Sequence, residues 1–297
     1  MPQRHTAVMS QYFIPLALVF SLVWSSAFVV GALAVPELGP MLTLVARFGL
    51  SALLMLPLCL LRRGHGLTDP ATVRAGLGLG VLNNAVYLGL TFEALRYTTP
   101  ALVVVCVSLA PFMTGLLAAL AGQERFTWRN AAGLALGLAG VTMITGPQVG
   151  SRDLYGIGLA LLGTLAFAGA ATIFRRQAAA LPLLPTNFWQ SLAGFVALLP
   201  LAWVDSGSVT TASAATLAAV VYLALGVSIW GMLLWFLLIR VGGAGRAAAV
   251  HLMNPIFGLG LSHLAFGSPI TLRAIGGCVM VATGLAVALR ARSAATR

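Results

Sequence analysis

Residues 75–121 decide the fold, and they read AGLGLGVLNNAVYLGLTFEALRYTTPALVVVCVSLAPFMTGLLAALA. The stretch contains two apolar runs, 75–96 and 99–121, separated by only a few polar residues. A membrane span needs about 20 consecutive apolar residues to cross about 30 Å of hydrocarbon. Each run meets this requirement, so the stretch predicts two membrane-spanning helices joined by a short turn.

The same pattern extends outward over the whole chain of 297 residues, of which 60% are hydrophobic and 8% are charged. An ordinary soluble domain carries about 25% charged residues, so a soluble globular domain is excluded. We therefore predict an all-α integral membrane protein with ten transmembrane helices. The apolar runs that define them are 12–33, 40–61, 75–96, 99–121, 130–146, 154–174, 184–204, 214–239, 244–266 and 273–290.

The chain also repeats itself at a spacing of 144 residues. Chance alignment of apolar sequence is the alternative, but matched arginine, proline and glycine residues are less easily produced by chance than matched leucines. Two halves of five spans each imply inverted repeats around a central cavity, an architecture typical of transporters. The matched pairs include Arg96 with Arg240, Pro111 with Pro255, Gly133 with Gly277 and Gly140 with Gly284. The predicted organisation is an N-terminus 1–11, a first repeat 12–146, a linker 147–153, a second repeat 154–290 and a tail 291–297.

The basic charge indicates topology rather than nucleic-acid binding. With the N-terminus in the cytoplasm, thirteen of the 17 basic residues, all arginines, fall on the cytoplasmic side and three on the other, while Arg47 lies inside a span. Cytoplasmic loops collect positive charge, so we expect a multi-pass inner-membrane protein with both termini cytoplasmic. The first apolar run resembles a secretory signal but is longer than the usual 7 to 15 residues, and we expect it to remain as the first helix.

Several motifs carry a family resemblance over residues 11–290. They are Trp24-Ser25-Ser26-Ala27-Phe28, Arg47-Phe48, the stretch 87–98, Leu109-Ala110-Pro111 and Glu124-Arg125-Phe126-Thr127. These motifs resemble the EamA-type transporters of the drug/metabolite transporter superfamily, and within it the exporters of amino acids and related metabolites. The resemblance implies a basket of helices around a central cavity, with the fifth and tenth helices at the periphery. The sequence departs from the family pattern where Ser268 stands opposite Glu124.

Polar and aromatic side chains inside the spans are the candidates for substrate binding, because a polar group facing lipid has no partner. Asparagine amides both donate to a carboxylate and accept from an ammonium, which suits a zwitterion. We predict that Asn83, Asn84 and Tyr87 line one cavity with Trp24 and Trp235; hydrogen bonding between helices is the alternative role. The full set of candidates is Trp24, Asn83, Asn84, Tyr87, Trp189, Gln190, Ser228, Trp235, His251 and Asn254.

Two prolines and two charges inside the spans complete the candidate residues. Pro111 and Pro255 occupy equivalent repeat positions, where each removes a backbone donor and forms either a hinge or a static kink. Arg47 and Glu93 are intramembrane charges, which indicate function by default. They are close enough in depth to pair; the alternative is a local contact of Glu93 with Arg96, with Arg47 reaching outward to the membrane surface.

The sequence contains no pattern of an enzyme, so we predict no catalytic residues, no metal and no cofactor. The three cysteines lie in apolar runs and are interpreted as small apolar side chains. Gly133, Gly137 and Gly140 allow close helix contact, either within a monomer or in a weak homodimer. We predict a secondary transporter that exports neutral and aromatic amino acids by alternating access, with a small-molecule substrate and membrane lipid as partners. An integral membrane enzyme for lipid or prenyl substrates and broad drug efflux are the alternatives.

Overall fold

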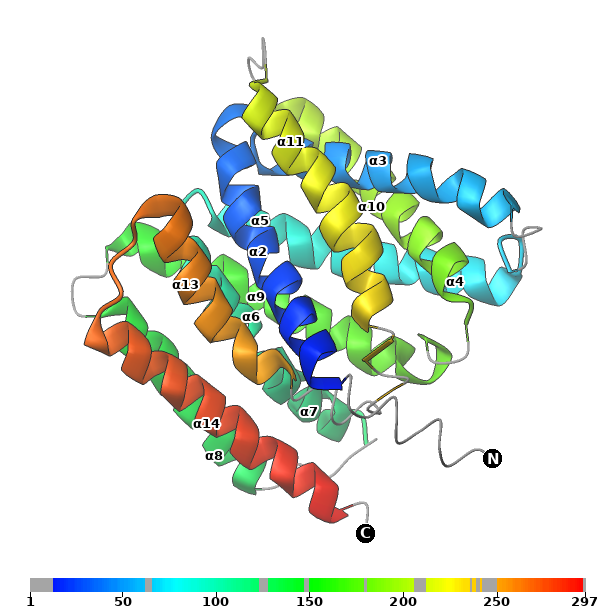
Figure 1. Ribbon diagram of the computed structural model, residues 1–297. Coiled ribbons are helices and arrows are strands. Elements are labelled where there is room, and N and C mark those ends of the chain that lie inside the picture. The colour runs from blue at the N-terminus through cyan, green and yellow to red at the C-terminus, as the bar shows by residue number, and fades with distance from the viewer. Residues whose placement is uncertain are drawn as a thin grey trace. The chain divides into compact units, whose positions relative to one another are not determined.

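The computed structural model describes residues 13–61, 66–122, 128–146, 150–178, 181–205, 212–235, 237, 238, 241 and 250–295. Regular structure in these residues is entirely helical (Figure 1). The predicted N-terminus 1–11 and Glu124 lie outside the described residues, as do 147–149 of the predicted linker. The three cysteines are buried, which agrees with their interpretation as small apolar side chains.

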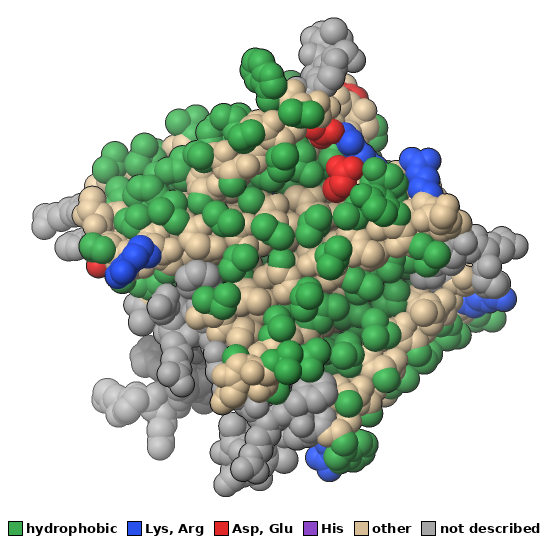
Figure 2. Space-filling view, turned by 180° about the vertical axis from the view of Figure 1, so that it is seen from behind, with side chains coloured by type: hydrophobic (Ala, Val, Ile, Leu, Met, Phe, Trp, Pro, Cys, Tyr) green, Lys and Arg blue, Asp and Glu red, His purple; other side chains and the backbone are tan. Residues whose placement is uncertain are grey.

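Seven helical stretches in the described part of the chain are long and apolar enough to cross a membrane. They are Phe13–Leu38, Pro40–Leu61, Pro70–Ala94, Pro100–Leu120, Ser151–Ile173, Leu183–Asp205 and Ala214–Trp235. Hydrophobic side chains are spread over the face shown in Figure 2, and acidic and basic ones are few there, which fits contact with lipid. The helical membrane class is confirmed, whereas the count of ten spans and the inverted repeat stay predictions.

The chain divides into two compact units, each built from segments of both halves of the sequence. Unit 1 contains residues 1–29, 100–149 and 231–297, and unit 2 contains residues 30–99 and 150–230. The first long helix, α2 (Phe13–Leu38), begins in unit 1 and ends in unit 2.

Unit 2 is organised around α10 (Leu183–Asp205), which packs along α3 (Pro40–Leu61) and against α4 (Pro70–Leu79) and the following segment η1 (Gly80–Tyr87) (Figure 1). Glycine permits this approach, because a Cβ atom at Gly80 would lie 2.5 Å from the carbonyl oxygen of Gln190. The remaining elements of this unit are α5 (Leu88–Ala94), α9 (Ser151–Ala178), α11 (Ala214–Tyr222) and η2 (Leu223–Gly231).

In unit 1, α8 (Trp128–Thr145) and α14 (Leu272–Ala295) lie side by side along their length (Figure 1). A Cβ atom at Gly140 would lie 2.6 Å from the carbonyl oxygen of Gly277. The glycines therefore serve close packing inside the chain, which is one of the two roles predicted for them. The other elements of this unit are α6 (Pro100–Val107), α7 (Ala110–Leu120), η3 (Val250–Met253) and α13 (Asn254–Phe266).

Both prolines of the predicted repeat lie where one helical segment ends and another begins. Pro111 is at the start of α7, after the turn that follows α6. Pro255 is at the start of α13, directly after the 3-10 turn η3. The missing N–H of proline is tolerated in the first turn of a helix, so both residues fit the helix starts at which they lie. Movement about these breaks stays a prediction.

The sequence did not predict that η1 and η2 are π-helical. The two segments occupy matching places in the 144-residue register, since Gly80 corresponds to Ala224 and Tyr87 to Gly231. A π-helix bonds residue i to i+5, which widens the turn, and such segments are frequent at functional sites. Asn83, Asn84 and Tyr87 lie on η1 and Ser228 lies on η2, so four predicted site residues occupy π-helical backbone.

Candidate substrate-binding site

A buried arginine lies at the contact of α3 with η2 in unit 2. Arg47 is only 4% exposed, and its Nε donates a hydrogen bond of 2.8 Å to the Ser228 hydroxyl. The Asn187 amide nitrogen donates to the Ser228 carbonyl oxygen at 2.8 Å, which fixes η2 against α10. We call Arg47, Asn187 and Ser228 the arginine cluster. Sequence reasoning missed Asn187, although it is a polar residue three positions before Gln190 in the same apolar span.

The Arg47 guanidinium is surrounded by aromatic rings and has no ion-pair partner among the described residues. Its Cζ atom lies 5.3 Å from the ring centre of Phe48 and 6.0 Å from that of Phe92. The Nη1 atom is buried and forms no hydrogen bond with the described residues. Cation–π contacts stabilise the charge without neutralising it, so the cluster retains an uncompensated positive charge.

Asn84 and Gln190 form a second contact in unit 2, between η1 and α10. The Asn84 amide nitrogen donates to the Gln190 backbone oxygen at 3.0 Å, and the Gln190 amide nitrogen donates to Asn84 Oδ1 at 3.0 Å. Both side chains are buried. We call these two residues the amide pair, and its reciprocal bonds connect two helices. The neighbouring Asn83 differs, because its Oδ1 is buried without a hydrogen-bond partner in the described part of the chain.

Two predicted aromatic site residues of unit 2 are engaged in packing. Tyr87 is buried, and its ring centre lies 5.0 Å from that of Phe167. The Trp189 ring nitrogen donates to the backbone oxygen of Leu67 at 2.8 Å, and its ring lies 5.3 Å from that of Phe188. Trp189 therefore fixes the first turns of α10 to the segment that precedes α4.

Unit 1 brings four predicted residues together, namely His251 and three that contact it. The ring centre of His251 lies 5.3 Å from Trp235, 6.5 Å from Trp24 and 6.0 Å from Phe20. The Asn254 amide nitrogen lies 2.9 Å from His251 Nδ1, a distance at which it donates to the unprotonated ring nitrogen. Phe20, Trp24, Trp235 and His251 form what we call the aromatic cluster. Sequence reasoning missed Phe20, which lies one helical turn before Trp24.

Hydroxyl groups of α2 bind the backbone at the starts of η3 and α13, next to the aromatic cluster. Ser21 donates to the Val250 carbonyl oxygen and Ser25 to the Asn254 carbonyl oxygen, each at 3.2 Å. The Asn254 side-chain oxygen is buried and lacks a hydrogen-bond partner among the described residues. Sequence reasoning did not select Ser21, although serines one helical turn apart in an apolar helix indicate contact with a neighbouring segment.

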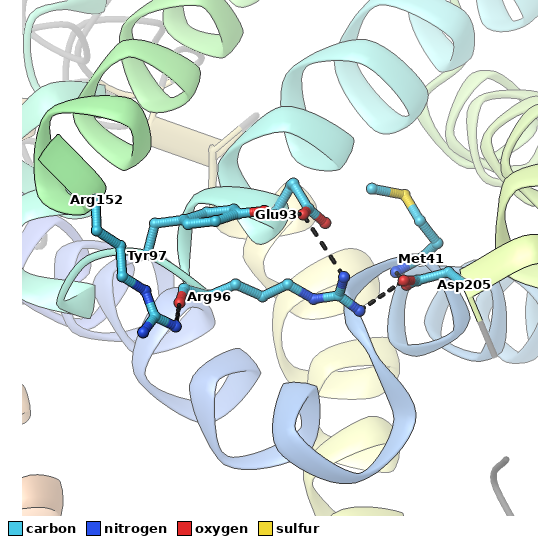
Figure 3. A network of polar contacts seen from close by, with 6 residues as sticks. All are labelled: Met41, Glu93, Arg96, Tyr97, Arg152 and Asp205. Carbon is cyan, nitrogen blue, oxygen red and sulfur yellow. Dashed lines mark hydrogen bonds and ion pairs between the residues drawn. The ribbon is translucent and has the colours of Figure 1, made fainter. Parts of the chain in front are cut away.

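A charged network lies at the ends of the unit 2 helices, and it contains the local contact of Glu93 with Arg96 rather than the alternative pair of Glu93 with Arg47 (Figure 3). Arg96 lies 2.6 Å from the Asp205 carboxylate and 3.7 Å from that of Glu93. Glu93 and Arg96 are three residues apart, so their side chains are neighbours and can pair without contact between two helices. The predicted outward reach of Arg47 is also absent, since this side chain is buried against Ser228.

Backbone groups and Tyr97 extend this network (Figure 3). The Met41 backbone nitrogen donates to Asp205 at 3.4 Å, and Arg152 donates to the Arg96 carbonyl oxygen at 2.8 Å. The Tyr97 hydroxyl donates to Glu93 at 3.3 Å, and the negative charge of Glu93 raises the pKa of Tyr97 above its ordinary value. The network thus joins the ends of α3, α5, α9 and α10.

The apolar helices and their buried polar clusters define a multi-pass membrane protein. Comparison with known proteins gives the family, because the model of the EamA-like transporter family matches residues 11–146 and 154–290. The chain belongs to this family and is a membrane transporter.

Individual relatives are distant but cover most of the chain. An uncharacterized transporter of Archaeoglobus fulgidus is 25% identical over 269 residues, covering 91% of this chain and 95% of the relative. A probable amino-acid metabolite efflux pump of Salmonella typhimurium is 26% identical over 284 residues, covering 91% and 92%. The Escherichia coli protein of the same name is 25% identical over 221 residues, covering 70% and 74%. A crystal structure of 21% identity superposes with a TM-score of 0.66 over 92% of this chain and 95% of that chain, which supports the fold alone.

Proposed function

We propose that this transporter exports neutral and aromatic amino acids, or related small metabolites, by alternating access across the inner membrane. The observation that carries the proposal is that buried amide and hydroxyl groups lie inside apolar helices together with aromatic side chains. Uncharged hydrogen-bonding groups suit a zwitterion, and aromatic rings suit an apolar side chain. Two relatives named as probable amino-acid metabolite efflux pumps support the same substrate class.

Each unit offers groups that can replace water around the substrate and groups that can select its side chain. A zwitterion that enters a dry site loses its hydration, and an unpaired buried polar group costs several kcal/mol. Asn83 and Asn254 each have a buried side-chain oxygen without a partner among the described residues, and these oxygens are available to an ammonium group. Trp24, Trp235 and Tyr87 supply ring area, worth about 1 kcal/mol for each aromatic contact.

We further propose that residues 12–146 and 154–290 are inverted repeats and that Pro111 and Pro255 form paired hinges. The family model matches both halves of the chain. The π-helical segments and the proline breaks also recur at matching places in the 144-residue register. The glycines of α8 pack against α14 of the same chain, so we propose a monomer or a weak homodimer. We also propose that both termini lie in the cytoplasm.

Counterflow in liposomes tests the proposed function. Purified protein is reconstituted into vesicles loaded with an unlabelled amino acid, and uptake of the same radiolabelled amino acid is followed. We expect transient accumulation of L-phenylalanine above that in protein-free vesicles. Absence of counterflow for every neutral and aromatic amino acid would refute the proposal.

A further inference from the structure

Arg47 is a buried cation whose positive charge the described residues leave uncompensated. Removing a guanidinium from water without a counter-ion is strongly unfavourable, so this arrangement requires an explanation. The Ser228 hydroxyl accepts from Nε, and the rings of Phe48 and Phe92 contact the charge. None of these groups is an anion, and Nη1 forms no hydrogen bond with them.

The carboxylates of the described residues are occupied elsewhere or form no ion pair with Arg47. Glu93 and Asp205 both pair with Arg96. Glu37 accepts hydrogen bonds from Ser213, and Asp69 accepts them from Thr72. An arginine with a purely structural role in a membrane span would be expected to pair with an acid. Glu93 directly follows the contact residue Phe92 in the sequence, but it pairs with Arg96.

The geometry of the guanidinium points to a ligand with two acceptor oxygens. An arginine side chain presents its donors as a rigid planar fork that matches a carboxylate with two parallel hydrogen bonds. The hydrogen bond from Nε to Ser228 fixes the plane of the guanidinium. The edge formed by the two terminal nitrogens, which include the unpartnered Nη1, is left to bind a ligand. The aromatic rings exclude water and strengthen any charge-assisted bond formed at that edge.

We propose that Arg47 binds the carboxylate of the transported substrate, so that a free carboxylate is what the substrates have in common. This inference rests on the proposed function and adds the chemical group that is recognised. Because Arg47 is 4% exposed here, the ligand reaches it in a different state of the transport cycle. Asn187 acts as a positioning residue, since it holds the η2 backbone that carries Ser228.

Competition against wild-type counterflow of radiolabelled L-phenylalanine tests this directly. The competitors are 3-phenylpropionate, which keeps the carboxylate and lacks the amine, and L-phenylalaninamide, which keeps the amine and lacks the carboxylate. A hydrogen-bonded charge pair accounts for about tenfold to hundredfold in affinity. We expect phenylalaninamide to compete that much more weakly than unlabelled phenylalanine and 3-phenylpropionate to retain measurable competition. Equal competition by phenylalanine and its amide would overturn the carboxylate assignment.

Substitution of Arg47 assigns the effect to this side chain. The readout is the ratio of half-inhibitory concentrations for phenylalaninamide and phenylalanine, which does not depend on the amount of folded protein. We expect the ratio to fall to near one in Arg47→Gln and to stay above one in Arg47→Lys, which keeps the charge without the fork. The matched control is Arg74→Gln, because Arg74 is an exposed arginine of the same unit, and it should retain the wild-type ratio.

Each outcome has a separate meaning. Wild-type protein without counterflow of any amino acid overturns the proposed function and this inference with it. Counterflow that persists with an unchanged ratio in Arg47→Gln overturns only the role of Arg47. Should neither Arg47 variant insert into the membrane, the competition on the wild-type protein alone decides whether a carboxylate is recognised.

Discussion

The amide pair gives a sharp test of which polar residues in the spans stabilise the fold. Asn84 donates to the backbone oxygen of Gln190 and accepts from its side chain, whereas Gln190 contributes its side chain to only one of these two bonds. Asn84→Ala therefore removes both bonds and Gln190→Ala removes one. A net hydrogen bond is worth about 1 kcal/mol, so Asn84→Ala should be more destabilising than Gln190→Ala by about that amount.

The coupling between the two side chains measures the single side-chain bond. Interhelical bonds in membrane proteins average about 0.6 kcal/mol in double-mutant cycles, with a maximum near 1.7 kcal/mol. We expect the cycle of Asn84→Ala and Gln190→Ala to give a coupling in this range when reversible unfolding in mixed detergent micelles is followed by circular dichroism. A coupling near zero would show that the bond contributes nothing in the membrane protein.

Asn83→Ala is the matched control, because Asn83 precedes Asn84 on the same π-helical segment. Its buried Oδ1 has no partner among the residues that the structure describes, so removing this atom relieves an unsatisfied group and should change the free energy of unfolding by less than Asn84→Ala. Transport should respond in the opposite order if Asn83 contacts the substrate. Equal destabilisation by Asn83→Ala and Asn84→Ala would refute the distinction drawn from their contacts.

Three further predictions concern the ends and faces of the helices. Arg96→Gln and Asp205→Asn should each lower the unfolding free energy by up to about 1 kcal/mol, less at high salt, because the ion pair is partly exposed. Hydrogen bonds from Thr72 hold the pKa of Asp69 below its ordinary value. Wild type should therefore be more stable than Asp69→Ala above the unfolded pKa of about 3.9. This difference in unfolding free energy should vanish as the pH falls through the lower folded pKa. Gly140→Leu should destabilise by about 1–3 kcal/mol through overpacking against α14, measured by thermal unfolding; an unchanged transition would contradict the close contact.

The helical spans could be predicted from sequence because length and composition suffice for them. A run such as 99–121 is long and mostly apolar. In lipid its backbone N–H and C=O groups find no water and must bond to one another, which a helix achieves within the segment. The proline breaks could also be located, because proline has no N–H wherever it stands. These features depend on local chemistry that the sequence displays directly.

The π-helical segments could not be predicted, because their backbone is set by neighbouring helices. Gly80 lies directly against the Gln190 backbone, and Asn84 bonds to the same residue, so tertiary contacts accompany the wider turn of η1. The sequence left the partner of Glu93 open between Arg47 and Arg96 for a related reason. Depth in the membrane allows a pair with Arg47, but depth leaves rotation about the helix axis undetermined, and Arg96 lies on the same helical turn as Glu93.

The contacts of each buried polar side chain separate structural from functional roles more sharply than residue type does. The Asn84 side chain uses both its nitrogen and its oxygen in hydrogen bonds, whereas Asn83 and Asn254 each retain an oxygen without a partner in the described ranges. Arg96 is neutralised by two carboxylates, whereas Arg47 is neutralised by none among the described residues. A polar atom left unsatisfied in a low-dielectric interior lowers stability, and selection against that loss removes it unless another state uses the atom. We propose that, in this transporter, that other state is the one with substrate bound.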